Sequence, residues 1–188
     1  MSDKFENAPE ALVLVHPGSL CGSARMAIGK QEANAIRENI LEEVARHNGP
    51  LVVIDGFLSD ELSFHENSLI NEALVENAAE GHLALRLWGC DAGEDTYSGW
   101  TSYGAPMEEA VFDGQEQAAK MIAARLADHR IVITGAWATD DLSTGCATSV
   151  LVALREALGG QAEVVYSSNV LYEPFEDDLE DEDCDVEA

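Results

Sequence analysis

Residues 131–146 read IVITGAWATDDLSTGC, an apolar run followed by a polar loop and a cysteine. The apolar periodicity continues from Cys146 to Leu158, which predicts a buried strand, a loop and then a helix that carries the cysteine in its first turn. The first turn of a helix has backbone N–H groups without intrahelical partners and lies at the positive end of the dipole. Such an environment favours the thiolate, which is the nucleophilic form of cysteine.

Strand-like and helix-like patterns alternate on both sides of this stretch. The predicted strands are residues 11–16, 51–55, 83–88, 130–135 and 162–167. The predicted helices are residues 29–47, 60–79, 113–128 and 146–158. Alternation at this spacing predicts an α/β fold with three layers. We expect a doubly wound, mostly parallel, Rossmann-like sheet of about five strands, forming a single domain over residues 1–172.

Several local signals predict where these helices begin and end. Ser143 or Thr144 is expected to cap the last helix, and the pair Gly159-Gly160 to end it. The pair Asn48-Gly49 is expected to end the first long helix in a left-handed cap.

The chain is strongly acidic, with 36 acids, 10 bases and a formal charge of −26. Ten of the acids lie in residues 173–188, which we expect to form a disordered acidic tail. No basic patch is available to neutralise phosphates, so direct nucleic-acid binding is not expected. The acidity fits either a halophilic host, where salt screens self-repulsion, or a basic protein partner.

Other features point to an intracellular location. The first residues have neither the basic start nor the apolar stretch of a secretory signal. No apolar run approaches the roughly 18–20 residues of a membrane helix. We therefore expect a cytoplasmic protein without membrane contact. The four cysteines, Cys21, Cys90, Cys146 and Cys184, form neither a disulfide framework nor a zinc pattern. We predict no metal and no cofactor.

Ligands of open parallel sheets bind beyond the carboxyl ends of the strands, so this edge gathers the candidate site residues. The catalytic candidates are Cys146 as nucleophile and His16 or Asp55 as its base or orienting group. The ligand-binding candidates are Gly18, Ser19, Cys21, Asp91, Trp137, Thr139 and Gly145. The irregular segment 90–114, rich in glycine and aromatic residues, is either a lid or an ordinary surface loop.

Each candidate also has a purely structural interpretation. Cysteine is often a small core residue, so Cys146 can simply pack the start of its helix. His16 can anchor a loop, and Asp55 can be a capping or solvated carboxylate. The first loop, residues 16–24, is rich in small residues before a helix, yet it matches neither the dinucleotide fingerprint nor the P-loop.

Residues 131–170 resemble the C-terminal part of the isochorismatase-like cysteine hydrolases. That family shows an apolar strand, a turn that contains a glycine and a threonine, a cysteine at a helix start, an alanine-rich helix and then another strand. The corresponding residues here are Gly135, Thr139, Cys146 and residues 147–158. The family's triad adds an aspartate at the end of the first strand and a lysine after a middle strand. Here His16 ends the first strand, and no lysine lies between Lys30 and Lys120, so the resemblance carries over Cys146 alone.

The sequence thus predicts a small α/β enzyme, hydrolase-like, with a cysteine nucleophile and a small polar substrate. Two alternatives stay open: a non-catalytic module that binds a small ligand or nucleotide, and an acidic interaction protein that binds a basic partner. The oligomeric state is left undetermined.

Overall fold

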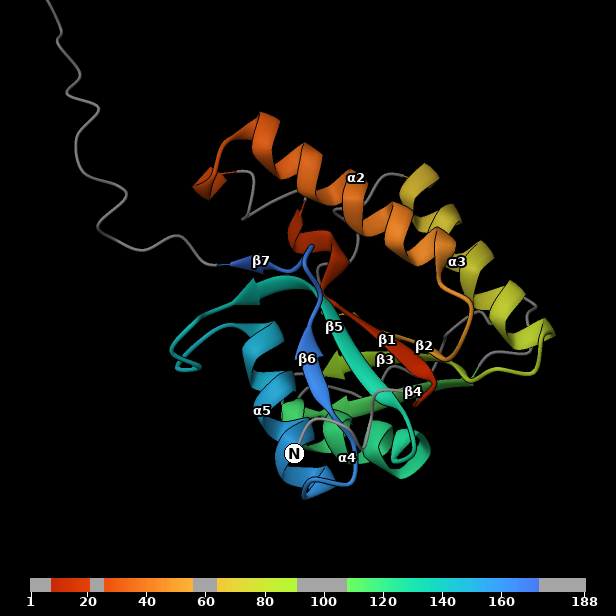
Figure 1. Cartoon of the computed structure of the whole chain (residues 1–188). Helices are drawn as coiled ribbons and strands as arrows, with labels where there is room; N and C mark the ends of the chain where they lie inside the picture. The colour runs from red at the N-terminus through yellow and green to blue at the C-terminus, as the bar shows by residue number, and fades with distance from the viewer. Residues whose placement is uncertain (1–7, 21–25, 56–63, 91–107, 173–188) are drawn as a thin grey trace, which may run out of the picture.

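The computed structural model describes residues 8–20, 26–55, 64–90 and 108–172 (Figure 1). Six strands form a parallel sheet in the order β4-β3-β2-β1-β5-β6, and a short seventh strand, β7, pairs with β5. The strands are β1 (Glu10–Val15), β2 (Leu51–Asp55), β3 (Ala84–Cys90), β4 (Glu108–Asp113), β5 (Arg130–Ala138), β6 (Val164–Tyr166) and β7 (Leu171–Tyr172). The described helices are η1 (Pro17–Leu20), α2 (Lys30–Arg46), α3 (Phe64–Ala79), α4 (Gly114–Leu126) and α5 (Cys146–Leu158).

The strand order confirms the predicted doubly wound fold. From β1 the chain builds outward through β2 and β3 to β4, then returns to the other side of β1 with β5 and β6. The two halves meet between β1 and β5, whose register pairs Val15 with Gly135. This meeting point is where open α/β sheets bind ligands, beyond the carboxyl ends of the strands.

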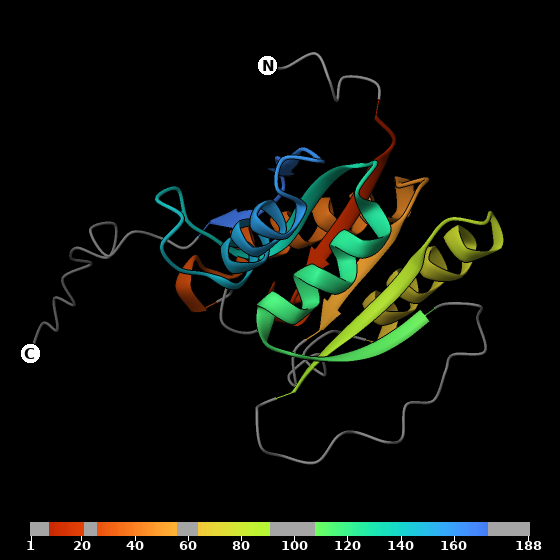
Figure 2. The same cartoon turned by 90° about the horizontal axis from the view of Figure 1, so that it is seen from below.

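Two helical layers cover the sheet, and the alternation of strand side chains assigns one core to each (Figure 2). In the α4/α5 core, Val13 and Val15 of β1 pack with residues of α4 and α5 such as Ile122 and Leu151. In the α2/α3 core, Leu12 and Leu14 of the same strand pack with residues of α2 and α3 such as Ile40 and Leu74. The strands therefore read as continuous apolar runs because both of their faces are covered.

Some predicted boundaries are wrong, each for a local reason. The sheet has an additional edge strand, β4, within the segment expected to be irregular; its sequence EEAVFD is half acidic and gives no apolar run. Helix α2 ends at His47 in an extended conformation rather than in a left-handed cap. A Cβ at Gly49 would lie 2.8 Å from the carbonyl oxygen of Glu10, so this glycine allows close passage of β1.

The predicted end of the last helix is confirmed, since Gly159 adopts the left-handed conformation that ends α5.

The predicted acidic tail, residues 173–188, and residues 91–107 of the segment that was expected to be a lid or a surface loop lie outside the described residues. Within the described ranges, no helix is both long enough and apolar enough to cross a membrane.

Candidate functional site

The carboxyl edge of the sheet brings His16, Asp55 and the end of β5 together. Parallel pairing aligns Val15 with Ile54 on one side and with Gly135 on the other, so His16 follows β1 between the ends of β2 and β5. Its backbone N–H donates to the carbonyl of Ile54 at 2.8 Å. The predicted gathering of these chain segments at one edge is therefore observed.

Two glycines in the segment 131–146 allow close backbone contacts that shape this edge. Gly135 has a φ of +103°, and a Cβ there would lie 2.1 Å from the carbonyl oxygen of Val15 in β1. Gly145 has a φ of +91°, and a Cβ there would lie 2.4 Å from the carbonyl oxygen of Trp137. The second contact returns the loop to the end of β5, so that α5 begins against the strand it follows.

Hydrogen bonds within the loop hold it in this shape. The Thr139 hydroxyl donates to the carbonyl of Thr144 at 3.0 Å, and the Thr139 N–H donates to the hydroxyl oxygen of Thr148 at 2.8 Å. The Asp141 carboxylate accepts from the N–H and the hydroxyl of Ser143 at 3.0 and 2.7 Å. These bonds from Ser143 stabilise the carboxylate and lower the pKa of Asp141.

Cys146 is the first residue of α5, as predicted, and is half-buried against the α4/α5 core. The predicted cap is wrong, because Gly145 is the N-cap and no side chain caps the helix. Ser143 is instead engaged by Asp141, and the carbonyl of Thr144 accepts from Thr139. The positive end of the helix is thus left without a side-chain cap beside the thiol.

His16 meets one requirement of a general base. Burial lowers the pKa of its imidazole below 6.5, so the ring is neutral at pH 7 and can accept a proton. Its backbone has a φ of +45°, an uncommon conformation for a residue with a side chain. The chain turns there from the end of β1 into η1.

Asp55 is not the solvated carboxylate that was one of its structural interpretations. The residue is only 2 % exposed, and one carboxylate oxygen lies 3.1 Å from Nε of Arg86, a residue that is itself 3 % exposed. Arg86 also donates to the side-chain oxygen of Asn71 in α3 at 2.8 Å. Burial raises the pKa of Asp55 to about 6, and the Arg86 charge opposes that rise.

Strand alternation places Asp55 on the same face as Leu51 and Val53, in the α2/α3 layer. Cys146 packs against the opposite core. Arg86 was not identified from the sequence, and its only signal was a single cation inside an apolar strand pattern.

The remaining predicted ligand-binding residues have separate environments. Gly18 is buried in η1, and Trp137 is half-buried against the α2/α3 core. The side chain of Ser19, together with Cys21 and Asp91, lies outside the described part of the structure. Within the ranges that the structure describes, no three His, Cys, Asp or Glu side chains gather as metal ligands.

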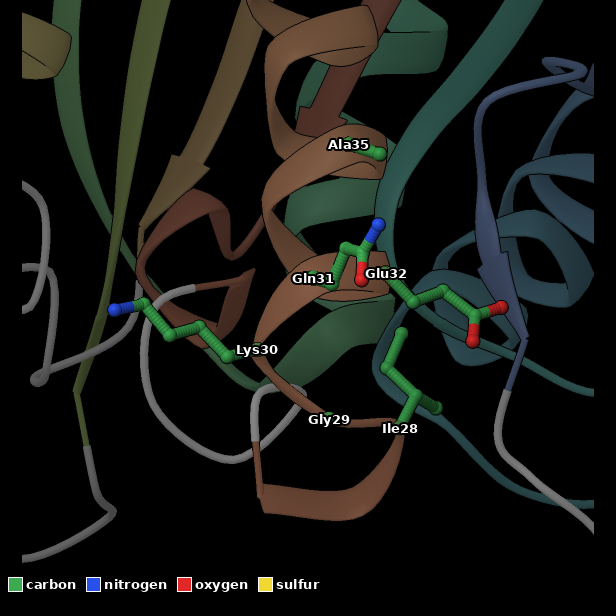
Figure 3. A pocket seen from close by; sticks show the side chains of 6 residues that line it. All are labelled: Ile28, Gly29, Lys30, Gln31, Glu32 and Ala35. Atoms are coloured by element: carbon green, nitrogen blue, oxygen red, sulfur yellow. The ribbon is translucent and has the colours of Figure 1, made fainter.

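A shallow open depression of about 530 Å³ lies at the first turn of α2 (Figure 3). Its lining residues are Ile28, Gly29, Lys30, Gln31, Glu32 and Ala35, none of which was predicted as a site residue. Gly29 is the N-cap, with a φ of 84° and no side-chain hydrogen bond to the helix. In Figure 3 the Lys30 and Glu32 side chains extend away from the helix in opposite directions.

Comparison with known proteins yields no match to a family model, a curated protein or a solved structure.

Proposed function

We propose that the chain is a small cysteine-dependent, hydrolase-like enzyme that acts on a small polar substrate. The observation that carries the proposal is the position of Cys146, at the start of a helix without a side-chain cap, on the carboxyl edge of a parallel sheet. The helix N-terminus favours the thiolate. The backbone N–H groups beside Gly145 are suited to stabilise an oxyanion.

The proposed reaction uses His16 as the base. The imidazole takes the thiol proton, and the sulfur attacks the substrate's carbonyl carbon, forming a C–S bond. The bond to the leaving group then breaks, and the leaving group takes the proton from the imidazolium. Water, deprotonated by His16, hydrolyses the thioester and releases the thiolate. Asp55 is the weaker candidate for this role because its carboxylate is paired with Arg86 in the other layer.

The resemblance to isochorismatase-like cysteine hydrolases supports the proposal through local structure. Thr139 lies in the turn and Cys146 at the helix start, as the resemblance implies, whereas Gly135 lies within β5 and not in the turn. The departure at His16 changes the proposed proton acceptor from a carboxylate to an imidazole.

Alkylation of the native protein across pH, followed by peptide mass spectrometry, tests the nucleophile. We expect Cys146 to react with iodoacetamide well below pH 8.5, about where an ordinary thiol ionises. Incubation with a panel of activated esters is expected to leave an acyl group on Cys146. Turnover of these esters is expected to be lost in Cys146→Ser. Glu156→Gln, an exposed change in the last turn of the same helix, is the matched control. Reactivity at Cys146 that rises only near the ordinary thiol range, without acylation, would contradict the proposal.

A second candidate function is a non-catalytic ligand-binding module. The depression at the first turn of α2 favours it, because backbone N–H groups at a helix start donate hydrogen bonds to anionic groups. Thermal-shift measurements with nucleotides test this function. A shift that is lost in Lys30→Gln and kept in Cys146→Ser would favour binding over hydrolysis.

The formal charge of −26 motivates two further proposals, a halophilic host and a basic protein partner. Unfolding in low and molar KCl tests the first, since a halophilic protein gains stability as salt screens its self-repulsion. Equal stability in both salts would contradict it. Pull-down with and without residues 173–188 tests whether the acidic segment engages a basic partner.

A further inference from the structure

The half-buried carboxylate of Glu43, on α2, contacts β5 and the turn between β6 and β7. The hydroxyl of Ser167 lies 2.7 and 2.8 Å from its two oxygens. The side-chain amide of Asn169 donates to it at 2.9 Å, and the hydroxyl of Thr134 in β5 at 3.4 Å. These donors are all uncharged, and they come from β5 and from the turn between β6 and β7.

The same turn is organised around Ser167. Its N–H donates to the carbonyl of Ile133 in β5 at 2.8 Å, and its hydroxyl oxygen accepts the N–H of Asn169 at 3.1 Å. The N–H of Val170 donates to the carbonyl of Ser167 at 3.2 Å. Glu43 thus fixes a turn whose next residues form β7.

Strand β7 then connects this turn to the end of β5, the strand that leads into the loop before Cys146 (Figure 1). Within the described residues it pairs with β5 at two positions, Leu171 with Ala136 and Tyr172 with Ala138. These positions flank Trp137, whose carbonyl oxygen is the atom that Gly145 approaches. The pairing therefore supports the short piece of β5 on which the helix start rests.

A second connection runs through the end of β6. The Tyr166 hydroxyl donates to the hydroxyl oxygen of Thr148 at 2.9 Å, and that oxygen also accepts the N–H of Thr139. Thr148 is only 1 % exposed and lies in the first turn of α5, two residues after Cys146. Tyr166 immediately precedes Ser167, so the turn held by Glu43 also sets the position of this phenol.

We propose that Glu43 is a positioning residue for the Cys146 site, acting through the β6–β7 turn on the loop 139–145. The proposal rests on the proposed function only in taking Cys146 as the reactive group; the coupling between the two segments is independent of catalysis. Loss of the carboxylate releases the turn, weakens the β5–β7 pairing and loosens the start of α5.

Hydrogen exchange of the full chain, combined with the alkylation rate at Cys146, tests this. Glu43→Ala removes every acceptor, and we expect exchange to rise about tenfold in residues 167–172 and also to rise in residues 136–148. The alkylation rate of Cys146 is expected to change in parallel. Glu43→Gln keeps one acceptor oxygen and is expected to give an intermediate effect.

Glu42→Ala is the matched control, because Glu42 is the neighbouring exposed residue that pairs with Arg46 within the same helix. It is expected to change neither readout. If Glu43→Ala unfolds the chain, Asn169→Ala, which removes one of the bonds, serves as the milder variant.

Faster exchange confined to residues 167–172, with residues 136–148 and the Cys146 rate unchanged, would overturn the positioning role. No change in either segment would show that Glu43 does not hold the β6–β7 turn. Faster exchange in both segments, with a Cys146 thiol of ordinary reactivity, would support the positioning role of Glu43 and count against the proposed hydrolase. Failure of the positioning role and failure of the proposed function are therefore distinguishable.

Discussion

The buried Asp55–Arg86 pair leads to a prediction about how the free energy of unfolding changes with pH. The direction of that change shows whether burial or the Arg86 charge has the larger effect on the pKa of Asp55. Burial disfavours the Asp55 carboxylate, whereas the Arg86 charge 3.1 Å away favours it. Burial is the larger effect, since the pKa of Asp55 rises from 3.8 to about 6. At about 1.4 kcal/mol for each pH unit, the rise corresponds to about 3 kcal/mol.

The direction of the pH dependence follows from proton binding. Between pH 3.8 and about pH 6 the folded chain keeps the Asp55 proton while the unfolded chain has lost it. The free energy of unfolding therefore falls as pH rises through this window and levels off above it. Asp55→Asn, which resembles the protonated side chain, removes that dependence.

Urea unfolding of wild type and Asp55→Asn from pH 4 to pH 7.5 measures the effect. We expect the free energy of unfolding of the variant, relative to wild type, to increase by about 2–3 kcal/mol over this range. The other carboxylates cancel in the difference, and so does any constant effect of the substitution on Arg86. Asp140→Asn, at an exposed position, controls for the loss of one negative charge.

The opposite trend would refute the reasoning. If Arg86 outweighed burial, removing the carboxylate would leave a buried cation unpaired, and the variant would lose stability relative to wild type as pH rises. A difference that does not change with pH would mean that folding leaves the proton affinity of Asp55 unaltered.

Three further predictions concern the segment around Cys146 and the opposite sheet edge. Gly135→Ala places a Cβ 2.1 Å from the Val15 carbonyl at a positive φ, so we expect a loss above about 3 kcal/mol, measured by urea unfolding. Thr148→Val removes the acceptor of two hydrogen bonds and is expected to cost about 1–3 kcal/mol; an unchanged melting temperature would contradict this. Arg130→Met breaks exposed ion pairs to Glu10 and Glu163 and is expected to cost under about 1 kcal/mol at low salt and less in 1 M KCl.

The sequence predicts the central part of the fold well because burial on both faces leaves a direct signal. β1, β2 and β5 are continuous apolar runs, and their register is observed as parallel pairs around β1. The edge strand β4 lacks this signal, because an edge position tolerates the acidic residues of EEAVFD. Strand β5 continues three residues beyond the predicted end, since Gly135 interrupts the pattern without ending the pairing.

The candidate site is only partly predictable for a related reason. Cys146 and its helix start can be identified locally, from a strand, a loop and an apolar periodicity. The partners of Asp55 and Glu43 lie 31 and 124 residues away in Arg86 and Ser167, and no local pattern encodes such pairs. The Glu43 side chain faces the β6–β7 turn, and the helical periodicity of residues 29–47 does not indicate this.

The two faces of the sheet are stabilised by different forces, and this difference bears on how the site is held. Within the described residues, the α2/α3 layer contains the Asp55–Arg86 and Arg37–Glu66 ion pairs and the Glu43 bonds. The α4/α5 core, on which Cys146 rests, is formed by apolar side chains. Apolar packing responds little to pH, whereas buried ionic contacts respond directly. Near pH 6, protonation of Asp55 is therefore expected to weaken its ion pair with Arg86 in the α2/α3 layer, while the apolar core beneath Cys146 is left unchanged.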